Sequence, residues 1–465
     1  MLFRSDFTVP GAGLVVTGTI FSGTVRTDET VILSPQGIPA RVRTIHAQNR
    51  TAGEARAGQR SALNITGAGL EKGRIHRGDW LLAEAVHLPV PRLDARIRVL
   101  KSEVRPLKHW TPVHVHIGAA DVTGRVAVLE GRSIEPGATA LAQLALDHPV
   151  GALRGDRCIL RDQSARRTVA GGRVIDPFAP SRGRARPDRL AALAAMEKDD
   201  PAAALQKLLE ISSQGVELGR FARAWNLGPE PEARLRDRVP MVRTGRPGAE
   251  IAIAPARWQE LRANTLEALA RWHQSAPDRV GPGEESLRTA LAERVPATVF
   301  ITVVHSRVDE GAVVGGGMFL RLPEHAPVMA PADRRMWEQV QPILETGHTK
   351  PPVLHEIAST LAMDPAVLRR FLIRAAGLGT VVRVAANRFM LPEAASELAA
   401  LAAAMADELP DGVITAAAFR DRSGIGRNLT IQVLEFFDRA GLTRRTGDAR
   451  RVLKPAEELF RPGAA

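Results

Sequence analysis

The sequence contains one cysteine, no tyrosine and no long apolar run. Cys158 alone cannot form an internal disulfide, and no stretch of about 18 uncharged apolar residues predicts a membrane-spanning helix. The first residues, MLFRSDFTVPGAG, show neither the basic and apolar regions of a secretory signal nor its cleavage site. These absences exclude a disulfide-stabilised secreted scaffold and a helical membrane protein. We expect a cytoplasmic protein.

Basic residues outnumber acidic ones, with 63 Lys and Arg against 51 Asp and Glu and a formal net charge of +12. Most of the excess is arginine, whose planar guanidinium suits phosphate groups. A polyanionic partner, above all nucleic acid, is therefore favoured. A coding bias toward arginine is the alternative explanation, because the absence of tyrosine beside abundant Ala, Arg, Gly and Pro indicates the same bias.

The 465 residues are too many for one hydrophobic core, so we expect several domains. Up to about residue 178, short runs of β-branched residues with period two are separated by Gly, Pro and Asp, as in Val113-His-Val-His-Ile117. This pattern predicts antiparallel β-barrels or sandwiches. A break near Pro89-Val-Pro91 divides the region into two β units, at residues 1–88 and 89–178, and we expect each of them to be a barrel.

The second half of the chain has a different pattern. Residues 179–188 are basic and lack apolar periodicity, which predicts a linker. Beyond it, helical spacing alternates with short β-like tails at intervals of roughly 60 to 75 residues, which is typical of tandem winged helices. The predicted modules are residues 189–255, 256–325, 326–395 and 396–465.

The last module carries a concentrated positive charge. Between Arg420 and Lys454 there are nine basic and four acidic residues. Ser423-Gly-Ile-Gly-Arg-Asn428 is a turn that opens a helix, so Arg427 and Asn428 lie in the first helical turn, where free backbone N–H groups also favour phosphate. Arginines flank Thr446-Gly-Asp448, which predicts the tight turn of a wing. A solvated surface that binds nothing is the alternative explanation.

Several motifs together resemble one protein family. One set of motifs resembles the second domain of elongation-factor-Tu-type GTPases; it comprises Gly11–Gly23, Pro39–Arg43, Ala57–Arg60, Ala62–Asn64 and Arg77–Asp79. Within that group of GTPases, these motifs are most similar to those of the selenocysteine-specific translation elongation factors (SelB). The third domain and last winged helix of that family are similar to the remaining motifs, which are His109-Trp110, Val122–Arg125, Leu160–Asp162, Ala170–Gly172, Phe419–Asn428, Leu434–Asp438 and Thr443–Arg451.

The resemblance implies two RNA partners and the ribosome. In the family, the last winged helix grips an mRNA hairpin downstream of a UGA codon, and the barrels bind selenocysteinyl-tRNA. The implied hairpin contacts are Arg420, Arg422, Arg427, Asn428, Arg444, Arg445, Arg450 and Arg451. Among them, Asn428 is a candidate base reader. A monomer without membrane association is expected.

Arg60 is the predicted recognition residue of the first barrel, because the family places an arginine in the Ala-Gly-Gln-Arg position near the aminoacyl end of the tRNA. A selenolate is anionic at neutral pH, so a guanidinium selects it over serine. An arginine that pairs with a surface carboxylate is the alternative. Arg4 is a second candidate, but it and Ser5 stand where the family usually carries an Asp-Arg pair. This departure puts full discrimination for selenocysteine in doubt.

No catalytic activity is predicted for this chain. The family begins with a GTPase domain, but neither Gly-x-x-x-x-Gly-Lys-Ser/Thr nor Asn-Lys-x-Asp occurs in the sequence. The resemblance therefore implies a factor whose GTPase domain, with its GTP and Mg²⁺, is missing. No cofactor is expected, and His114 and His116 lack the further ligands of a zinc site.

Two other functions remain as alternatives. A winged-helix DNA-binding transcriptional regulator would use the same C-terminal modules but leaves the β-rich half unexplained. A fragment of another translational GTPase would end after the third domain, whereas about 280 residues follow here. An enzymatic function is not supported, because the sequence shows no set of nucleophile, base and orienting residue.

Overall fold

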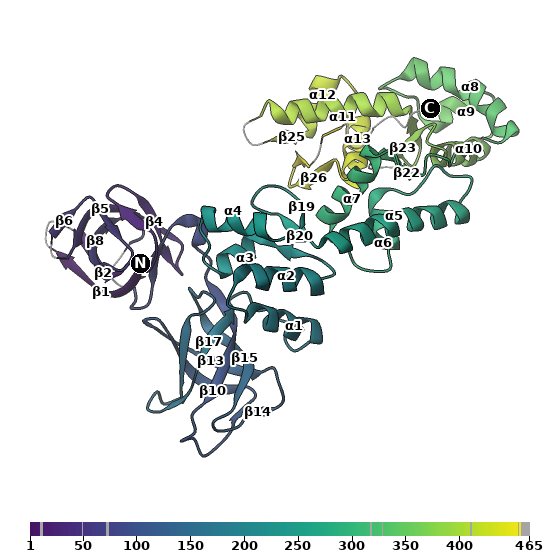
Figure 1. Cartoon of the computed structure of the whole chain (residues 1–465). Helices are drawn as coiled ribbons and strands as arrows, with labels where there is room; N and C mark the ends of the chain where they lie inside the picture. Colours follow the sequence, from purple (N-terminus) through teal and green to yellow (C-terminus); the bar gives the residue numbers. More distant parts are fainter. Residues whose placement is uncertain are drawn as a thin grey trace. The chain divides into compact units, whose positions relative to one another are not determined.

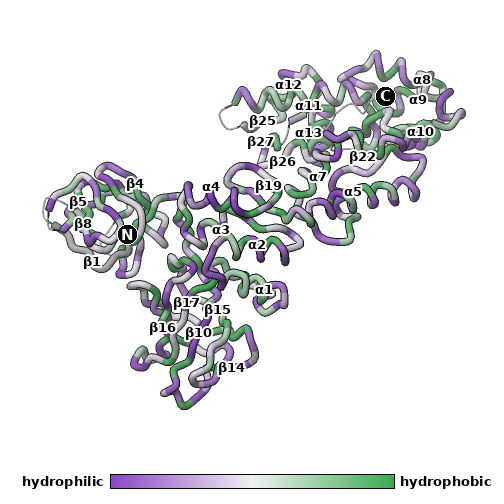
Figure 2. Tube along the Cα trace, viewed as in Figure 1, coloured by the Kyte–Doolittle hydropathy of each residue, from purple (hydrophilic) through white to green (hydrophobic). Residues whose placement is uncertain are grey.

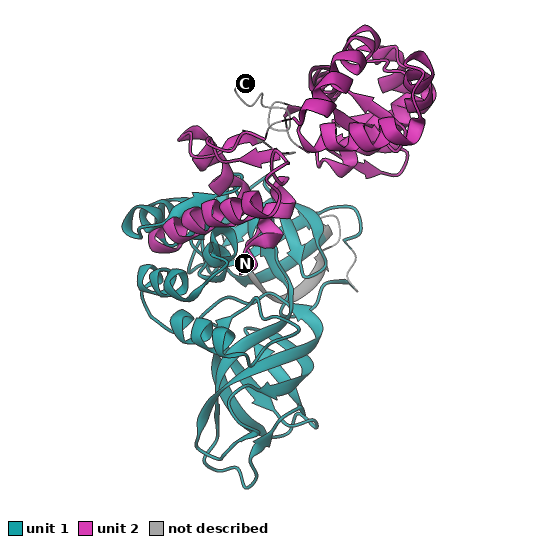
Figure 3. Ribbon diagram, turned by 90° about the vertical axis from the view of Figure 1, so that its right-hand side faces the viewer, with its two compact units in different colours: residues 1–254 teal, residues 255–465 magenta. Residues whose placement is uncertain are grey.

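The computed structural model describes residues 1–9, 13–48, 50–70, 74–316, 319–327, 329–409, 412–453 and 455–456, without the side chains of residues 2–9, 13 and 316. The chain forms two compact units, Met1–Ala254 and Pro255–Ala465, which are coloured separately in Figure 3. Figure 1 labels the elements. Within the described ranges, no helix is long and apolar enough to cross a membrane.

The first barrel is an antiparallel sheet in the order β4-β9-β1-β2-β8-β5-β6, and an additional β4–β5 pairing closes it. Val16, Val42, Ile45 and Leu63 are fully buried in its core. β3 and β7 pair with each other and form a separate two-stranded sheet. The strands are β1 Leu2–Val9, β2 Gly13–Thr19, β3 Thr24–Arg26, β4 Thr30–Ser34, β5 Ile38–Ala47, β6 Arg50–Ala52, β7 Glu54–Arg56, β8 Arg60–Thr66 and β9 Trp80–Leu82.

The second barrel is closed in the order β10-β15-β13-β12-β16-β17, with β11 and β14 forming a small pair. A short 3₁₀ helix, η2 Glu84–Val86, precedes it. The strands are β10 Val90–Val99, β11 Leu107–Lys108, β12 Thr111–Ile117, β13 Ala120–Val128, β14 Ser133–Ile134, β15 Thr139–Val150, β16 Arg157–Arg161 and β17 Thr168–Asp176.

Alternation of apolar and polar residues explains why these segments form barrel strands. In β12, Val113, Val115 and Ile117 are buried, whereas His114 and His116 between them are half-buried. Successive side chains on a strand point to opposite faces, so one set fills the barrel and the other faces outward. Figure 2 shows apolar and polar residues following one another along the strands. Each fully buried aliphatic side chain contributes roughly 1.5–3 kcal/mol.

The first winged helix completes unit 1. Its helices are α1 Pro187–Met196, α2 Pro201–Ile211, α3 Leu218–Ala224 and α4 Pro229–Arg238, and its three-stranded sheet has the order β18-β20-β19. The strands are β18 Val216–Glu217, β19 Val242–Thr244 and β20 Ile251–Ile253. Leu193, Leu205 and Phe221 pack in a core that also includes Leu141 and Ile175 of the second barrel.

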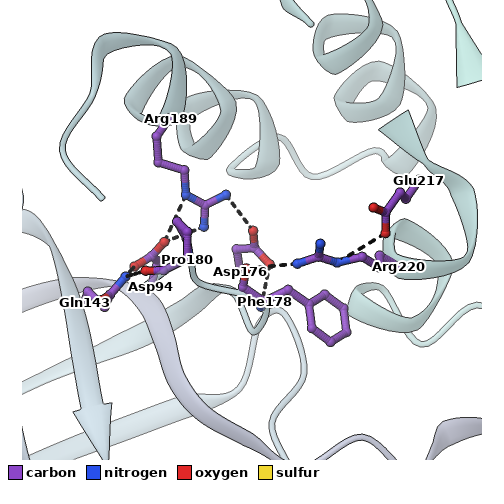
Figure 4. A network of polar contacts seen from close by, with 8 residues as sticks. All are labelled: Asp94, Gln143, Asp176, Phe178, Pro180, Arg189, Glu217 and Arg220. Carbon is purple, nitrogen blue, oxygen red and sulfur yellow. Dashed lines mark hydrogen bonds and ion pairs between the residues drawn. The ribbon is translucent and has the colours of Figure 1, made fainter. Parts of the chain in front are cut away.

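A buried polar network ties the predicted linker to the second barrel (Figure 4). Arg189 lies between two carboxylates, with its Nε 3.1 Å from Asp94 Oδ2 and its Nη1 2.8 Å from Asp176 Oδ2. Gln143 Nε2 donates to Asp94 Oδ1 at 3.0 Å and to Pro180 O at 3.1 Å. Burial raises the pKa of the Asp94 carboxyl despite the guanidinium beside it. Residues 179–188 are therefore anchored at both ends, and their last two residues already belong to α1.

Unit 2 contains three further helical modules, each ending in a wing of paired strands. The second winged helix has α5 Pro255–Ser275, α6 Glu284–Ala290, α7 Ala297–Asp309, β21 Val314–Gly316 and β22 Phe319–Arg321. The third has α8 Pro331–Gly347, α9 Leu354–Thr360, α10 Pro365–Gly377, β23 Val382–Ala385 and β24 Arg388–Met390. The fourth has α11 Pro392–Asp407, β25 Val413–Thr415, α12 Ala416–Ser423, α13 Arg427–Arg439, β26 Thr443–Thr446 and β27 Ala449–Val452.

The third and fourth winged helices share one hydrophobic core. Val382, Val384 and Met390 of the third module's wing pack with Leu398 of α11 and with Phe437 of α13. Arg439 Nη2 also donates to Val384 O at 2.6 Å. The division expected after residue 395 falls inside α11, because this helix belongs to the shared core. The predicted fold class, two antiparallel β-barrels followed by tandem winged helices, is confirmed.

Candidate nucleic-acid interface

The turn between α12 and α13 presents an open helix start. Gly424 ends α12 in a left-handed conformation, with φ 66°, and its N–H donates to Arg420 O at 2.9 Å. Gly426 is the N-cap of α13, no side chain caps the helix, and its first turn contains no acidic residue. Among the described residues, no side chain accepts from the first N–H groups of α13, which lie at the positive end of the helix dipole, an arrangement that favours an anion.

Amphipathic spacing fixes which side of α13 faces outward. Leu429, Val433 and Phe437, at intervals of four residues, are buried in the module core. Side chains three and four apart share one face of a helix, so the opposite face is left to exposed residues. These exposed residues are Arg427, Asn428, Ile431, Glu435 and Arg439. The structure therefore leaves both predicted contacts on α13, Arg427 and Asn428, open to solvent.

The wing places arginines opposite one another. β26 and β27 pair with Arg444 opposite Arg451 and Arg445 opposite Arg450, and the connecting turn is Gly447-Asp448, with Gly447 at φ 64°. This is the tight turn that the sequence predicts. Arg444, Arg445 and Arg451 are exposed. Like charges directly opposite each other in a sheet are destabilising, and a bound polyanion would remove that cost.

Arg450 differs from the other wing arginines and leaves the predicted contact set. Only 6% of its surface is exposed, and its Nε donates to Asp438 Oδ2 at 2.9 Å. Arg450 is the buried end of an ion pair between β27 and α13, so its guanidinium cannot reach an RNA phosphate without breaking that pair. Sequence reasoning counted Asp438 only as one of four acidic residues and missed its role as the residue that positions the wing.

The two predicted arginines of α12 are exposed but paired with carboxylates. Arg420 Nη2 lies 2.6 Å from Asp421 Oδ1, and Arg422 Nη2 lies 3.0 Å from Glu408 Oε1. Exposed ion pairs of this kind are worth about 0–1 kcal/mol, so an RNA phosphate can compete for either arginine. Lys454, the last basic residue counted in this stretch, lies outside the described residues.

In the first barrel, Arg60 begins β8 opposite Thr19 of β2 and is exposed. Among residues whose side chains are described, no carboxylate pairs with it. The alternative, that Arg60 forms a surface ion pair, thus finds no carboxylate partner among the described side chains. Arg4 lies in β1, but its side chain is outside the described part of the structure, as is Gly11 of the glycine-rich motif.

His114 and His116 lie on the outer face of the second barrel, because they alternate with the buried residues of β12. His114 Nδ1 donates to Asp121 Oδ1 at 3.1 Å, and His116 Nε2 lies 3.8 Å from the same oxygen. In the described ranges, no group of three or more His, Cys, Asp and Glu residues is arranged to hold a metal ion. The pair is therefore organised around one carboxylate on the neighbouring strand.

Comparison with family models matches four segments of the chain. Residues 13–82 match "Elongation factor Tu domain 2", and residues 94–181 match "Selenocysteine-specific elongation factor, beta-barrel domain". Residues 266–322 and 409–452 each match a model described as "Elongation factor SelB, winged helix". The last of these segments contains α12, α13 and the wing.

Relatives that align along almost all of this chain extend this agreement. The chain is 35% identical over 443 residues to the selenocysteine-specific elongation factor of Escherichia coli (strain K12), covering 95% of this chain and 68% of that protein. It is 31% identical over 447 residues to the corresponding protein of Haemophilus influenzae, covering 95% and 69%. The crystal structure of bacterial selenocysteine-specific elongation factor EF-Sec aligns with a TM-score of 0.54 at 18% identity, covering 97% of this chain and 69% of that one, and supports the fold.

Proposed function

Because this chain belongs to the family of selenocysteine-specific elongation factors, we propose that it acts in selenocysteine incorporation at UGA codons by binding two RNAs. In this proposal the barrels bind selenocysteinyl-tRNA, and the fourth winged helix binds an mRNA hairpin downstream of the codon. The ribosome is the common partner of both complexes. The protein acts as a monomer in the cytoplasm, where translation takes place.

The observation that carries the hairpin assignment is the joint exposure of the α13 start and the wing arginines. Arg427 stands at an uncapped helix start, while Arg444 and Arg451 face each other across the wing. Phosphate contacts from these groups would fix the register of the RNA without reading its sequence. Asn428, which carries both a donor and an acceptor in the same helical turn, is the proposed reader of an unstacked loop base.

For the tRNA, we propose that Arg60 recognises the charged selenolate of the aminoacyl group. Its exposure at the start of β8 and the lack of a carboxylate partner among the described side chains leave the guanidinium available. A charge-assisted hydrogen bond distinguishes a selenolate from a neutral serine hydroxyl.

We further propose that GTP hydrolysis belongs to a GTPase domain outside these 465 residues. The sequence contains no phosphate loop and no guanine-reading Asn-Lys-x-Asp, so no residues here fit GTP with Mg²⁺. The alignments, which extend over 68–69% of the relatives, are compatible with this division.

The test is a titration of the full chain with the hairpin that follows a UGA codon in a selenoprotein message, measured from about 50 to 200 mM salt. We expect tight binding that depends on the loop sequence and is lost in Arg427→Ala. A hairpin with the same stem and a scrambled loop separates base reading from phosphate contact. Equal, salt-sensitive binding to that hairpin and to duplex DNA would contradict the proposal and favour the DNA-binding regulator.

A further inference from the structure

A lysine of the third winged helix lies against the turn Gly424–Gly426 of the fourth, the recognition turn, which connects α12 to α13. Lys350 follows α8, and a Cβ built on Gly424 would lie 3.9 Å from its Nζ. Gly424 connects α12 to the turn that opens α13, three residues before Arg427. The ammonium group of one module is thus located beside the helix start that the neighbouring module offers to RNA.

The backbone that carries Lys350 is held from several sides. Its N–H donates to Gly347 O at 2.7 Å, and Arg388 Nη1 donates to the following residue, Pro351, at its carbonyl oxygen (2.6 Å). His348 Nε2 donates to Glu397 Oε2 of α11 at 2.6 Å. Since α11 and the wing of the third module also share a core with α13, the loop and the recognition turn form one packed assembly.

The charges around the turn make Lys350 stand out. Arg420 and Arg422 are already paired with Asp421 and Glu408. Among the described residues, no carboxylate pairs with Lys350 or with Arg427, and both side chains are exposed. A polyanion can therefore reach these two cations, like the exposed wing arginines, without displacing a carboxylate.

We propose that Lys350 contacts a backbone phosphate of the RNA that the fourth winged helix binds, so that the RNA interface spans two modules. This inference rests on the proposed hairpin-binding function. Lysine suits the role because its ammonium is a point charge on a flexible stem, which pairs with a phosphate but does not match the planar edge of a base. Lys350 contributes affinity and register, while base discrimination stays with α13.

The experiment compares hairpin binding by the full chain and by Lys350→Ala, Lys350→Arg and Arg427→Ala across a salt series. Losing one phosphate contact reduces the magnitude of the slope of log K against log salt by about 0.7–0.9. Raising salt from about 50 to 200 mM should therefore weaken Lys350→Ala binding about threefold less than wild-type binding. The variant should bind hairpins with native and scrambled loops with the same fractional loss, and Lys350→Arg should restore the slope.

Arg334→Ala is the matched control, because it removes one exposed cation near the start of α8, about 20 Å along the helix from Gly347. It should leave affinity and slope unchanged. If Lys350→Ala also binds like wild type while Arg427→Ala loses binding, the two-module interface is wrong and the proposed function stands. If the wild-type chain does not bind the hairpin, both are wrong. Thermal unfolding of each variant checks that loss of binding does not reflect loss of fold.

Discussion

Asp438 of α13 holds Arg450 of β27 through a hydrogen bond from Arg450 Nε to Asp438 Oδ2 at 2.9 Å. The other carboxylate oxygen accepts from Thr443 Oγ1 of β26 at 2.6 Å. One side chain of α13 therefore anchors both β26 and β27 of the wing. The direction in which the exposed wing arginines project depends on this carboxylate.

The first prediction separates the wing arginines by stability. Arg450→Ala leaves Asp438 with a partly buried charge and no arginine partner, so the free energy of unfolding of the last module should fall by about 3 kcal/mol. Arg444→Ala changes an exposed residue and should alter it by less than about 0.5 kcal/mol. Urea denaturation followed by circular dichroism measures both.

When hairpin binding is measured instead of stability, Arg444 should matter more than Arg450. Arg444→Ala should weaken binding at unchanged stability, whereas Arg450→Met, which keeps the apolar stem but not the charge, should weaken it only as far as the wing loosens. A large loss of affinity in a stably folded Arg450→Met would contradict the assignment of Arg450 as an anchoring residue.

The sequence could not make this distinction. The positions of the helix start, the wing turn and the flanking arginines follow from Ser423–Asn428 and Thr446–Asp448, and the structure agrees with them. Strand register decides which arginine points inward, and a one-residue shift reverses it. Net charge counts treat Arg444 and Arg450 alike, whereas burial does not. The nearness of Lys350 to Gly424 depends on tertiary packing and has no sequence signal.

The second prediction concerns the buried network beside the second barrel. Asp94→Asn removes one of the two carboxylates around Arg189 and so weakens a charge-assisted hydrogen bond, which should make unfolding of this region easier by about 1.5 kcal/mol. Trypsin should then cleave faster at Arg182 and Arg184. Lys207→Ala is the matched control, because its ion pair with Glu210 spans 3.0 Å between exposed side chains and contributes little. Equal cleavage rates in wild type and Asp94→Asn would show that residues 179–188 are as loose as their composition predicts.

That composition explains why the segment was predicted as a linker. Residues 179–188 lack apolar periodicity, and their anchors, Asp94 and Gln143, lie far away in the sequence. A hydrogen bond to the backbone oxygen of Pro180 leaves no trace in residue type. The β-barrels, by contrast, follow from local alternation that the sequence displays directly.

The third prediction is a pH dependence of the second winged helix. Burial, and then the stacked ring of His325 at 3.7 Å, lower the pKa of His273 from 6.5 to about 4. Between those values the unfolded chain binds a proton that the folded chain does not. Stability present above pH 6.5 is therefore lost as pH falls toward 4.

His273→Gln keeps an acceptor for the N–H of Leu322, which His273 Nε2 accepts at 3.2 Å, and removes the titrating group. We expect the variant to lose less stability than wild type between pH 7.5 and 5. Carboxylates elsewhere titrate equally in both proteins, so the difference between them reports His273. Parallel curves would show that its folded pKa is not lowered.

The last prediction tests Arg60. Removing its guanidinium should weaken binding of selenocysteinyl-tRNA more than binding of seryl-tRNA, because the selenolate is charged and the serine hydroxyl is not. Arg60→Ala should therefore lower the ratio of the two affinities, by about tenfold for a charge-assisted hydrogen bond of roughly 1.5 kcal/mol. Arg60→Lys retains the charge and should keep part of the ratio. Arg43→Ala, another exposed arginine of the same barrel, should leave the ratio unchanged because Arg43 already donates to Thr66 Oγ1 and lies near Asp28. Equal losses for both tRNAs in Arg60→Ala would mean that Arg60 contacts the RNA backbone and that selenocysteine is selected by other residues.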